Sequence, residues 1–262
     1  MKGIVVALTA LAMAGCATSG YQKFYQSYGD VSQLQDVTFL SEGEEPIVYQ
    51  VDIQEMASSV KSLRARDYVA IGSSSFNGVY EDISRAKAHA KKLKAVVVIV
   101  GAAYTETQTS TVPISMPSTQ TTYGSGSVYA GGMYGTYTGS STTYGSTVVP
   151  VTVHHRRYDQ GAVYFVKGHR KYRFGIQLAD LTPQHRQALG RNTGALIDVV
   201  VEKTPAFYAN VMEGDVIIAI DGREIRDPAE AISVMASIPE DVESSVLKVI
   251  RGGVEIDVDV KF

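Results

Sequence analysis

The spacing of apolar residues along the first two thirds of the chain predicts alternating strands and helices. Short apolar runs rich in β-branched residues predict strands, and apolar residues that recur every three or four positions predict helices. Strands are expected at about 46–51, 68–72, 95–100 and 162–166, and helices at about 53–63 and 80–94. The run from Ala95 to Val100 is apolar at every position, which favours a central strand covered on both faces. The pattern therefore predicts an α+β domain at 46–168, with two helices on a sheet of four or five strands.

A long uncharged segment interrupts this domain. Between Thr107 and His155 the sequence contains no Asp, Glu, Lys or Arg, and Gly, Ser, Thr and Tyr dominate. Thr and Tyr favour extended strands, whereas the glycine-rich centre favours disorder. We expect this insertion, at about 107–150, to leave the sheet as a hairpin whose middle, about 120–145, is mobile. The sequence leaves open whether the insertion is a contact surface or a neutral loop.

In the C-terminal third, a helix, a turn, a strand and a hairpin are predicted in close succession. The dipeptide Thr204-Pro205 is typical of a helix start, and Asn210 suits the left-handed turn that ends a helix. The apolar run 216–220 predicts a strand. Asp221-Gly222 follows it, and this dipeptide is favoured in two-residue type I′ hairpins.

This succession resembles the core of a PDZ domain, in the form carried by bacterial HtrA-type proteases. The resemblance extends over about 170–262. It includes the motif Phe174-Gly175-Ile176, a strand at 194–200, a helix from Asp227-Pro228 to about Ile238 and a hairpin turn at 251–253. The resemblance implies a β-sandwich or barrel capped by two helices, so the expected fold class of the whole chain is α+β.

PDZ domains bind a peptide, usually a free C-terminus, as an added strand between their second strand and their long helix. The resemblance implies a loop from Arg173 to Ile176 whose backbone N–H groups bind the terminal carboxylate, with Gly175 allowing the close approach. The peptide-binding residues that it implies are Arg173, Phe174, Gly175, Ile176, Gln177, Leu178, Ile232 and Met235. Ordinary core packing is the alternative for each side chain. A bulky residue at position 175 is expected to abolish binding and to leave the fold intact.

A basic linker lies just before this loop. His169, Arg170, Lys171 and Arg173 follow one another closely. They form either a solvated connection or a source of positive field beside the carboxylate of a bound peptide, and the sequence does not separate these interpretations.

The sequence contains no recognisable catalytic constellation. An HtrA-type protease needs a double β-barrel with a nucleophilic serine in a glycine-rich turn. Only the small α+β domain precedes the PDZ-like segment, and the serines at 73–75 have no G-x-S-G-G context. His154 and His155 would face opposite sides of a strand, so they do not bind one metal ion together. We therefore expect no enzyme activity, no metal and no cofactor.

The first residues resemble a bacterial lipoprotein signal. A lysine follows Met1, residues 3–13 form an apolar stretch too short for an ordinary membrane span, and Ala14-Gly15 precede Cys16, the single cysteine. We expect a signal peptide at 1–15, a lipid anchor on Cys16 and a polar tether at 16–45. A plain secretory signal with an incidental cysteine is the alternative. Ala17 follows the cysteine, and this resembles the signal of a bacterial lipoprotein that is sorted to the outer membrane. We therefore expect the protein to lie there and to face the periplasm.

These features allow three interpretations of function. The first is a lipid-anchored envelope protein that binds protein C-termini or exposed strands, as an adaptor, scaffold or quality-control factor. In the second, the uncharged insertion is the working surface, and in the third the chain delivers substrates to a separate periplasmic protease. A net charge of −3 gives no reason to expect a nucleic-acid partner. The oligomeric state is not predicted.

Overall fold

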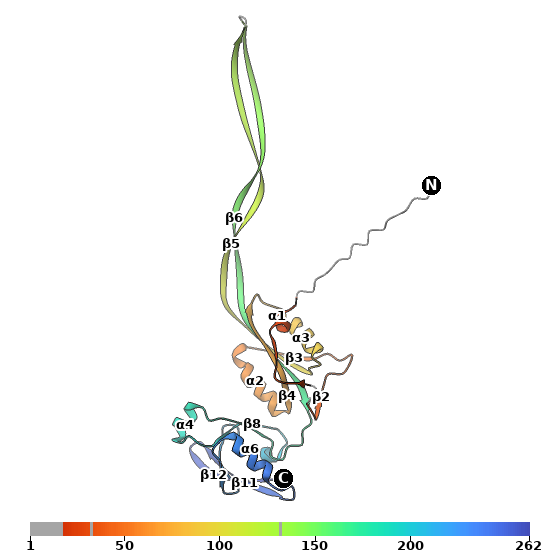
Figure 1. Cartoon of the computed structure of the whole chain (residues 1–262), viewed down its shortest axis with the longest axis vertical. Helices are drawn as coiled ribbons and strands as arrows, with labels where there is room; N and C mark the ends of the chain where they lie inside the picture. Colours follow the sequence, from red (N-terminus) through yellow and green to blue (C-terminus); the bar gives the residue numbers. More distant parts are fainter. Residues whose placement is uncertain (1–17, 32–33, 131–132) are drawn as a thin grey trace, which may run out of the picture. The chain divides into compact units, whose positions relative to one another are not determined.

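The computed structural model describes residues 18–31, 34–130 and 133–262, so Cys16 and the predicted signal peptide lie outside the described residues. The chain divides into two compact units. The smaller unit, residues 78–80 and 104–158, we call the ribbon. The larger unit contains an N-terminal module up to Gly168, a linker at 169–172 and a C-terminal module at 173–262 (Figure 1). Of the helices that the structure describes, none has both the length and the apolar character that a membrane crossing requires.

The N-terminal module is built on a six-stranded sheet. The strands lie in the order β1-β4-β6-β5-β3, and β2 pairs with β6. Strands β3 and β5 are parallel. The elements are α1 (Gly20–Lys23), β1 (Tyr25–Ser27), β2 (Val37–Thr38), β3 (Ile47–Val51), a 3₁₀ turn η2 (Ile53–Glu55), α2 (Met56–Ala65), β4 (Tyr68–Gly78), α3 (Ile83–Lys92), β5 (Val97–Ala130) and β6 (Met133–Gly168).

Strand β5 has helices on both faces, as its unbroken apolar run predicted. Val98 and Val100 belong to the cluster that includes α3, whereas Val97 and Ile99 belong to the cluster that includes α2. None of the four side chains is more than 1% exposed. The alternation follows from the pleat, which turns successive side chains to opposite faces of the sheet. The prediction of a central strand is confirmed.

The prediction of a polar tether over 16–45 is wrong for the part of this segment that forms α1, β1 and β2. Strand β1 pairs with β4 and strand β2 pairs with the end of β6. Tyr21 is 1% exposed, and the N–H of Gly20 donates to a carboxylate oxygen of Glu81 over 2.7 Å. Tyr21 is therefore a core residue, and Tyr25 and Phe39 pack against the same core, whereas Phe24 and Tyr28 are exposed. The N-terminal module thus begins about 25 residues earlier than its apolar runs suggested.

In the ribbon, β5 and β6 form one long antiparallel hairpin. The hydroxyls of Thr121 and Thr142 lie 3.3 Å apart across it, and the hydroxyl of Thr109 lies 3.1 Å from Nδ1 of His154. Strand β5 continues to Ala130 and β6 resumes at Met133. The expected hairpin is confirmed, whereas the mobility expected of its middle stays a prediction.

The C-terminal module is a second sheet with three helices. Its strands lie in the order β12-β11-β9-β8-β7, and β10 pairs with β9. Because β12 and β7 end this order, the sheet is open and is not the closed barrel that was one of the expected forms. The elements are β7 (Ile176–Ala179), α4 (Pro183–Leu189), β8 (Ala195–Val200), α5 (Pro205–Tyr208), β9 (Val216–Ile220), β10 (Arg223–Glu224), α6 (Pro228–Ser237), β11 (Ser244–Arg251) and β12 (Val254–Lys261).

The turn residues of this module behave largely as their types predicted. Asn210 has a φ of 60° after α5, and Asp221 and Gly222 have φ values of 48° and 80°, as a type I′ hairpin requires. Thr204 precedes α5 with extended backbone, but its hydroxyl makes no capping hydrogen bond. It donates instead to the carbonyl of Val201 over 2.7 Å, which fixes this side chain beside Gly175.

Candidate functional site

Strand β7 is the last strand of its sheet, so one of its edges is not paired within the sheet. Its register sets Ile176 opposite Val200, and the N–H of Val201 donates to the carbonyl of Gly175 over 2.7 Å. In an antiparallel ladder such a bond flanks a residue pair whose own N–H groups point outward. The N–H of Ile176 therefore points away from β8, toward the open edge.

The loop before β7 presents two more backbone donors. The carbonyl of Phe174 accepts a hydrogen bond from the N–H of Ala206 over 2.9 Å, which fixes the plane of the loop. None of the described residues accepts a hydrogen bond from the N–H of Phe174 or Gly175. Gly175 has a φ of 86°, and successive N–H groups around such a residue converge on an anion-sized concavity. A carboxylate is the natural ligand of this arrangement.

Arg173 and Phe174 support this loop from behind. The guanidinium of Arg173 donates to the carbonyls of Ile238 and Pro239, just after α6, and lies 4.5 Å from the centre of the Phe262 ring. Phe174 is 5% exposed and packs edge-to-face on Phe262 at 4.8 Å. Neither side chain lines the cavity beside β7. The structure therefore gives both residues a positioning role, and the side chain of Phe174 takes the core-packing alternative.

A cavity of about 530 Å³ lies beside the open edge of β7. This volume falls in the range of about 300–1,000 Å³ that is usual for ligand pockets. Five of the predicted peptide-binding residues line it: Ile176, Gln177, Leu178, Ile232 and Met235. Ile232 and Met235 are three residues apart on α6, so they share one helix face. The structure thus brings together the strand and helix residues that the sequence nominated separately.

A family model described as the PDZ domain matches residues 173–262, which is the whole C-terminal module. The module also has the edge strand, the glycine turn and the flanking helix from which a peptide groove of this kind is built. Residues 173–262 form a PDZ domain.

Relatives of this PDZ domain occur in larger proteins. The chain is 34% identical over 99 residues to the magnetosome formation protease MamE of Magnetospirillum gryphiswaldense, and 29% identical over 91 residues to a probable periplasmic serine endoprotease, DegP-like, of Rickettsia prowazekii. These stretches cover 37% and 34% of this chain but only 13% and 18% of the two relatives. The chain is also similar to a crystal structure of the HtrA3 PDZ domain bound to a phage-derived ligand, with 20% identity, a TM-score of 0.29, and coverage of 34% of this chain and 81% of that one.

The N-terminal module and the linker form the other wall of the PDZ cavity. The residues on that wall are Arg64, Tyr68, Val69, Ala70, Arg170 and Tyr172. Their placement depends on how α2 and β4 meet the PDZ domain, which no local sequence pattern encodes. Only Arg170 was flagged by the sequence, as part of the basic linker.

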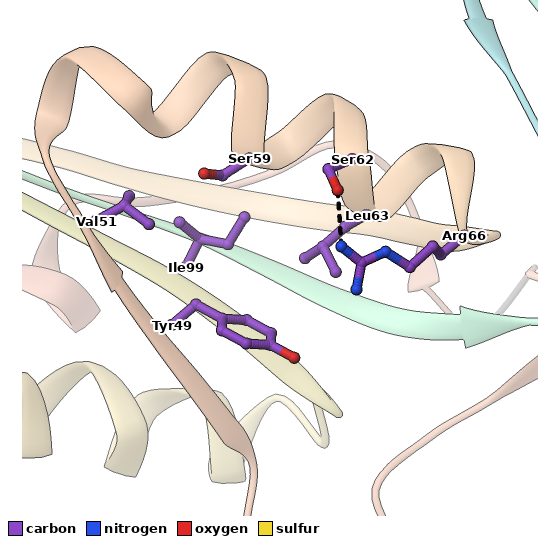
Figure 2. Close-up of a pocket in the computed structure, with 7 residues that line it drawn as sticks. All are labelled: Tyr49, Val51, Ser59, Ser62, Leu63, Arg66 and Ile99. Atoms are coloured by element: carbon purple, nitrogen blue, oxygen red, sulfur yellow. Dashed lines mark hydrogen bonds between the residues drawn. The ribbon is translucent and has the colours of Figure 1, made fainter.

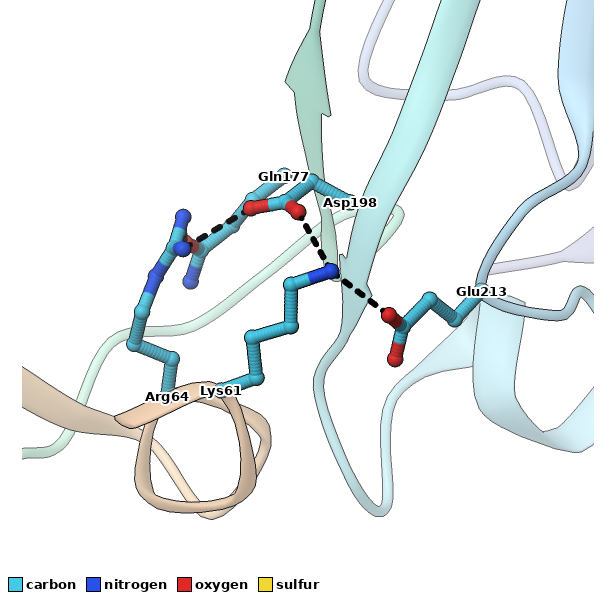
Figure 3. Close-up of polar contacts among 5 residues, drawn as sticks. All are labelled: Lys61, Arg64, Gln177, Asp198 and Glu213. Carbon is cyan, nitrogen blue, oxygen red and sulfur yellow. Dashed lines mark hydrogen bonds and ion pairs between the residues drawn. The ribbon is translucent and has the colours of Figure 1, made fainter. Parts of the chain in front are cut away.

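An ion-pair network fastens α2 to the PDZ domain beside the cavity (Figure 3). Lys61 lies 2.9 Å from Asp198 and 2.7 Å from Glu213, and Arg64 lies 2.8 Å from Asp198. Arg64 also donates from Nε and Nη2 to Oε1 of Gln177, over 2.9 and 2.6 Å. Gln177 is therefore both a cavity residue and part of this attachment.

The protonation states support the network at neutral pH. Burial by itself raises the pKa of Asp198, but the hydrogen bonds from Lys61 and Arg64 outweigh it and hold the pKa below its ordinary value. Hydrogen bonds to Glu213 and then to Asp198 raise the pKa of Lys61. Because both shifts favour the charged forms, the pairs stay ionised at neutral pH.

The linker is fixed to the N-terminal module by a second contact. The hydroxyl of Tyr172 donates to Oδ1 of Asp67 over 2.7 Å, and the N–H of Gly168 donates to the carbonyl of the same residue. Burial, followed by the contact with Asp67, raises the pKa of Tyr172 to about 12, so its hydroxyl remains a donor at neutral pH. Tyr172 is therefore held as part of the cavity wall.

A second, smaller cavity lies between α2 and the edge strand β3 (Figure 2). Its volume is about 160 Å³, and its lining includes Tyr49, Leu63 and Ile99. Arg66 is turned across it, and its Nη2 donates to the hydroxyl of Ser62 over 2.8 Å. This volume is below the range usual for ligand pockets, and no residue that the sequence nominated lines it. The PDZ cavity is therefore the better candidate site.

The structure overturns the expectation that a bulky residue at position 175 leaves the fold intact. A Cβ atom on Gly175 would lie 2.1 Å from Oγ1 and 2.2 Å from Cβ of Thr204, and the backbone there has positive φ. Any side chain would therefore strain the loop and collide with a buried neighbour. The loop needs glycine at position 175 to fold, as well as to let a ligand approach its backbone. A variant at this position therefore does not separate binding from folding.

Proposed function

We propose that the chain is a non-enzymatic binding protein that captures the C-termini of other proteins in its PDZ groove. One observation carries the proposal. The unpaired edge of β7 and the apolar face of α6 border one cavity of ligand size, and the backbone donors of Phe174 and Gly175 lie in the loop directly before β7. A PDZ domain uses this combination to add a peptide as an extra strand.

We infer from the geometry how such a peptide would lie. Its terminal carboxylate accepts hydrogen bonds from the N–H groups of Phe174, Gly175 and Ile176. From there the peptide runs antiparallel to β7, because its C-terminus is at the start of that strand. Its last side chain enters the apolar space between β7 and α6, near Ile232 and Met235. A small or medium apolar residue suits this position.

We propose that the chain binds without cleaving. The two curated relatives are named as proteases, but the stretches they share with this chain are 99 and 91 residues long, the size of a PDZ domain. The N-terminal module, with its sheet between α2 and α3, is unlike the double β-barrel on which a protease of this type depends. A role as an adaptor that binds peptides is therefore favoured over peptide hydrolysis.

We also propose that the protein acts in the bacterial cell envelope, with a lipid on Cys16 that holds it to the outer membrane facing the periplasm. The support is the signal-like sequence before Cys16, together with relatives of which one is named as periplasmic. Acyl chains on this residue give stable attachment because each buried CH₂ contributes about 0.8 kcal/mol. Cys16→Ser is expected to move the protein from the detergent phase to the aqueous phase, and unchanged partitioning would rule out this anchor.

A substrate-delivery subunit of a separate protease would use the same groove, so it is the second candidate. The two roles separate in one experiment on envelope extracts. A delivery subunit co-purifies with a protease whose cleavage products change when the groove is blocked, whereas an adaptor is recovered with intact partners whose cleavage pattern does not change.

Peptide binding itself is tested with matched free and amidated ligands. We expect a selected peptide with an apolar last residue to bind the full chain in the free-acid form and to lose at least about tenfold in affinity as the C-terminal amide. Isothermal titration calorimetry measures both affinities. Equal affinities for the two forms, or no binding by any peptide from a random C-terminal library, would contradict the proposed function.

A further inference from the structure

In this chain the peptide groove is a two-sided cavity and not an open furrow on the PDZ surface. One side consists of β7 and α6, which are the expected parts of a PDZ groove. On the other side, β4 contributes Tyr68, Val69 and Ala70, and the linker contributes Arg170 and Tyr172. Except for the exposed Arg170, these side chains are half-buried. A bound strand would therefore touch both walls.

The second wall is fixed in place by several independent contacts. The pairs from Lys61 and Arg64 hold α2 against Asp198 on the middle of β8, and the N–H of Glu202 donates to the carbonyl of Ala65 over 2.7 Å. The contact of Tyr172 with Asp67 holds the linker. Because Arg64 and Tyr172 take part in these bonds and also line the cavity, the wall is part of the site and not a remote neighbour.

Among the described residues, the charged side chains that line the cavity are basic. Two arginines, Arg64 and Arg170, line it, and none of the described acidic side chains does. Arg64 is already engaged by Asp198 and Gln177. Arg170 interacts with the hydroxyl of Tyr172, but no carboxylate in the described part of the chain forms an ion pair with it. Its charge is therefore available to a ligand.

We propose that the linker and the N-terminal module are part of the peptide site, and that Arg170 makes it select peptides with an acidic residue upstream of the C-terminus. The inference rests on the proposed function, because it assumes a peptide that runs from the carboxylate loop along β7. Residues upstream of the terminus then pass between the two walls, where an Asp or Glu side chain pairs with the unneutralised guanidinium. A basic residue at the same place is repelled.

The test compares peptides that differ at one position in the full chain. Fluorescein-labelled peptides share one free apolar C-terminus and carry Glu, Gln or Lys at each of the upstream positions in turn, and anisotropy gives the affinities. At the most sensitive position we expect Glu to be preferred over Lys by about fivefold or more at low salt, and by less at high salt. Arg170→Gln is expected to abolish the preference, whereas Lys171→Gln retains it, because Lys171 does not line the cavity.

Three outcomes would overturn the inference. Equal affinities for Glu and Lys peptides in the unaltered protein would leave the proposed function standing and remove the acidic selection. If the preference for Glu survives Arg170→Gln, or disappears equally with Lys171→Gln, it arises from the general electrostatic field of the protein. It then does not arise from a contact with Arg170. If no peptide of any charge binds, the proposed function fails and the inference fails with it.

Discussion

Ile232→Asp is expected to reduce peptide affinity at least about 30-fold while leaving the PDZ domain folded. Ile232 lines the apolar part of the cavity on α6, and its side chain is 59% exposed. A carboxylate there would be desolvated by the last side chain of the peptide and would repel its terminal carboxylate, which together cost about 2 kcal/mol or more. Calorimetry with the selected free-acid peptide measures the loss, and thermal unfolding checks the fold.

Val254→Asp is the matched control for this variant. Val254 begins β12, is 62% exposed and does not line the cavity. The Val254→Asp variant therefore introduces the same charge at a similarly exposed apolar position of the same domain. We expect its peptide affinity to be unchanged. Equal losses in the two variants would point to a non-specific effect of charge, and full binding by Ile232→Asp would remove α6 from the site.

Gly175→Ala is expected to destabilise the PDZ domain by about 3 kcal/mol or more. The added methyl group meets Thr204, whose hydroxyl is fixed by its bond to the carbonyl of Val201. Positive φ costs about 1–2 kcal/mol for a residue with a side chain, and overpacking at a buried site costs about 1–3 kcal/mol more. Urea unfolding measures the change, and peptide binding is expected to be lost with the fold of the loop.

Gly190→Ala separates the two contributions. Gly190 ends α4 with a φ of 61°, and a Cβ atom there has no heavy atom within 4 Å. This variant therefore carries the backbone strain without the collision, and we expect a cost of only about 1–2 kcal/mol. If Gly175→Ala is no more destabilising than Gly190→Ala, the contact with Thr204 does not restrict the loop.

The PDZ domain was predictable because its signals are local. Asp221-Gly222 fixes a hairpin, Asn210 ends a helix, and the unbroken apolar run of β9 fixes a buried strand, so each element could be placed from a few adjacent residues. The same holds for the central β5 in the N-terminal module. Where the residues have one local conformational preference, sequence and structure agree.

The predictions from sequence that were wrong or incomplete concern residues whose surroundings depend on contacts distant in sequence. Tyr21 lies in a polar stretch with no periodic pattern, yet it is buried, because it packs on Phe76 of β4 and its carbonyl accepts a hydrogen bond from Ser74. These partners are about fifty residues away in sequence, so no local pattern indicates them. Gly175 was correctly assigned to the loop, but its clash with Thr204 becomes visible only when β7 and α5 are placed together. Arg64 and Tyr68 reach the cavity through the packing of one module on the other, for which the sequence carries no signal.

The most direct measurement of the central claim is the response of individual backbone amides to a bound C-terminus. The full chain, labelled with ¹⁵N, is titrated with the free-acid peptide and with its C-terminal amide. We predict large downfield amide-proton shifts at Phe174, Gly175 and Ile176 with the free acid, and their absence with the amide, because only a carboxylate fills these donors. Shifts confined to other parts of the chain, or identical shifts with both peptides, would contradict the account.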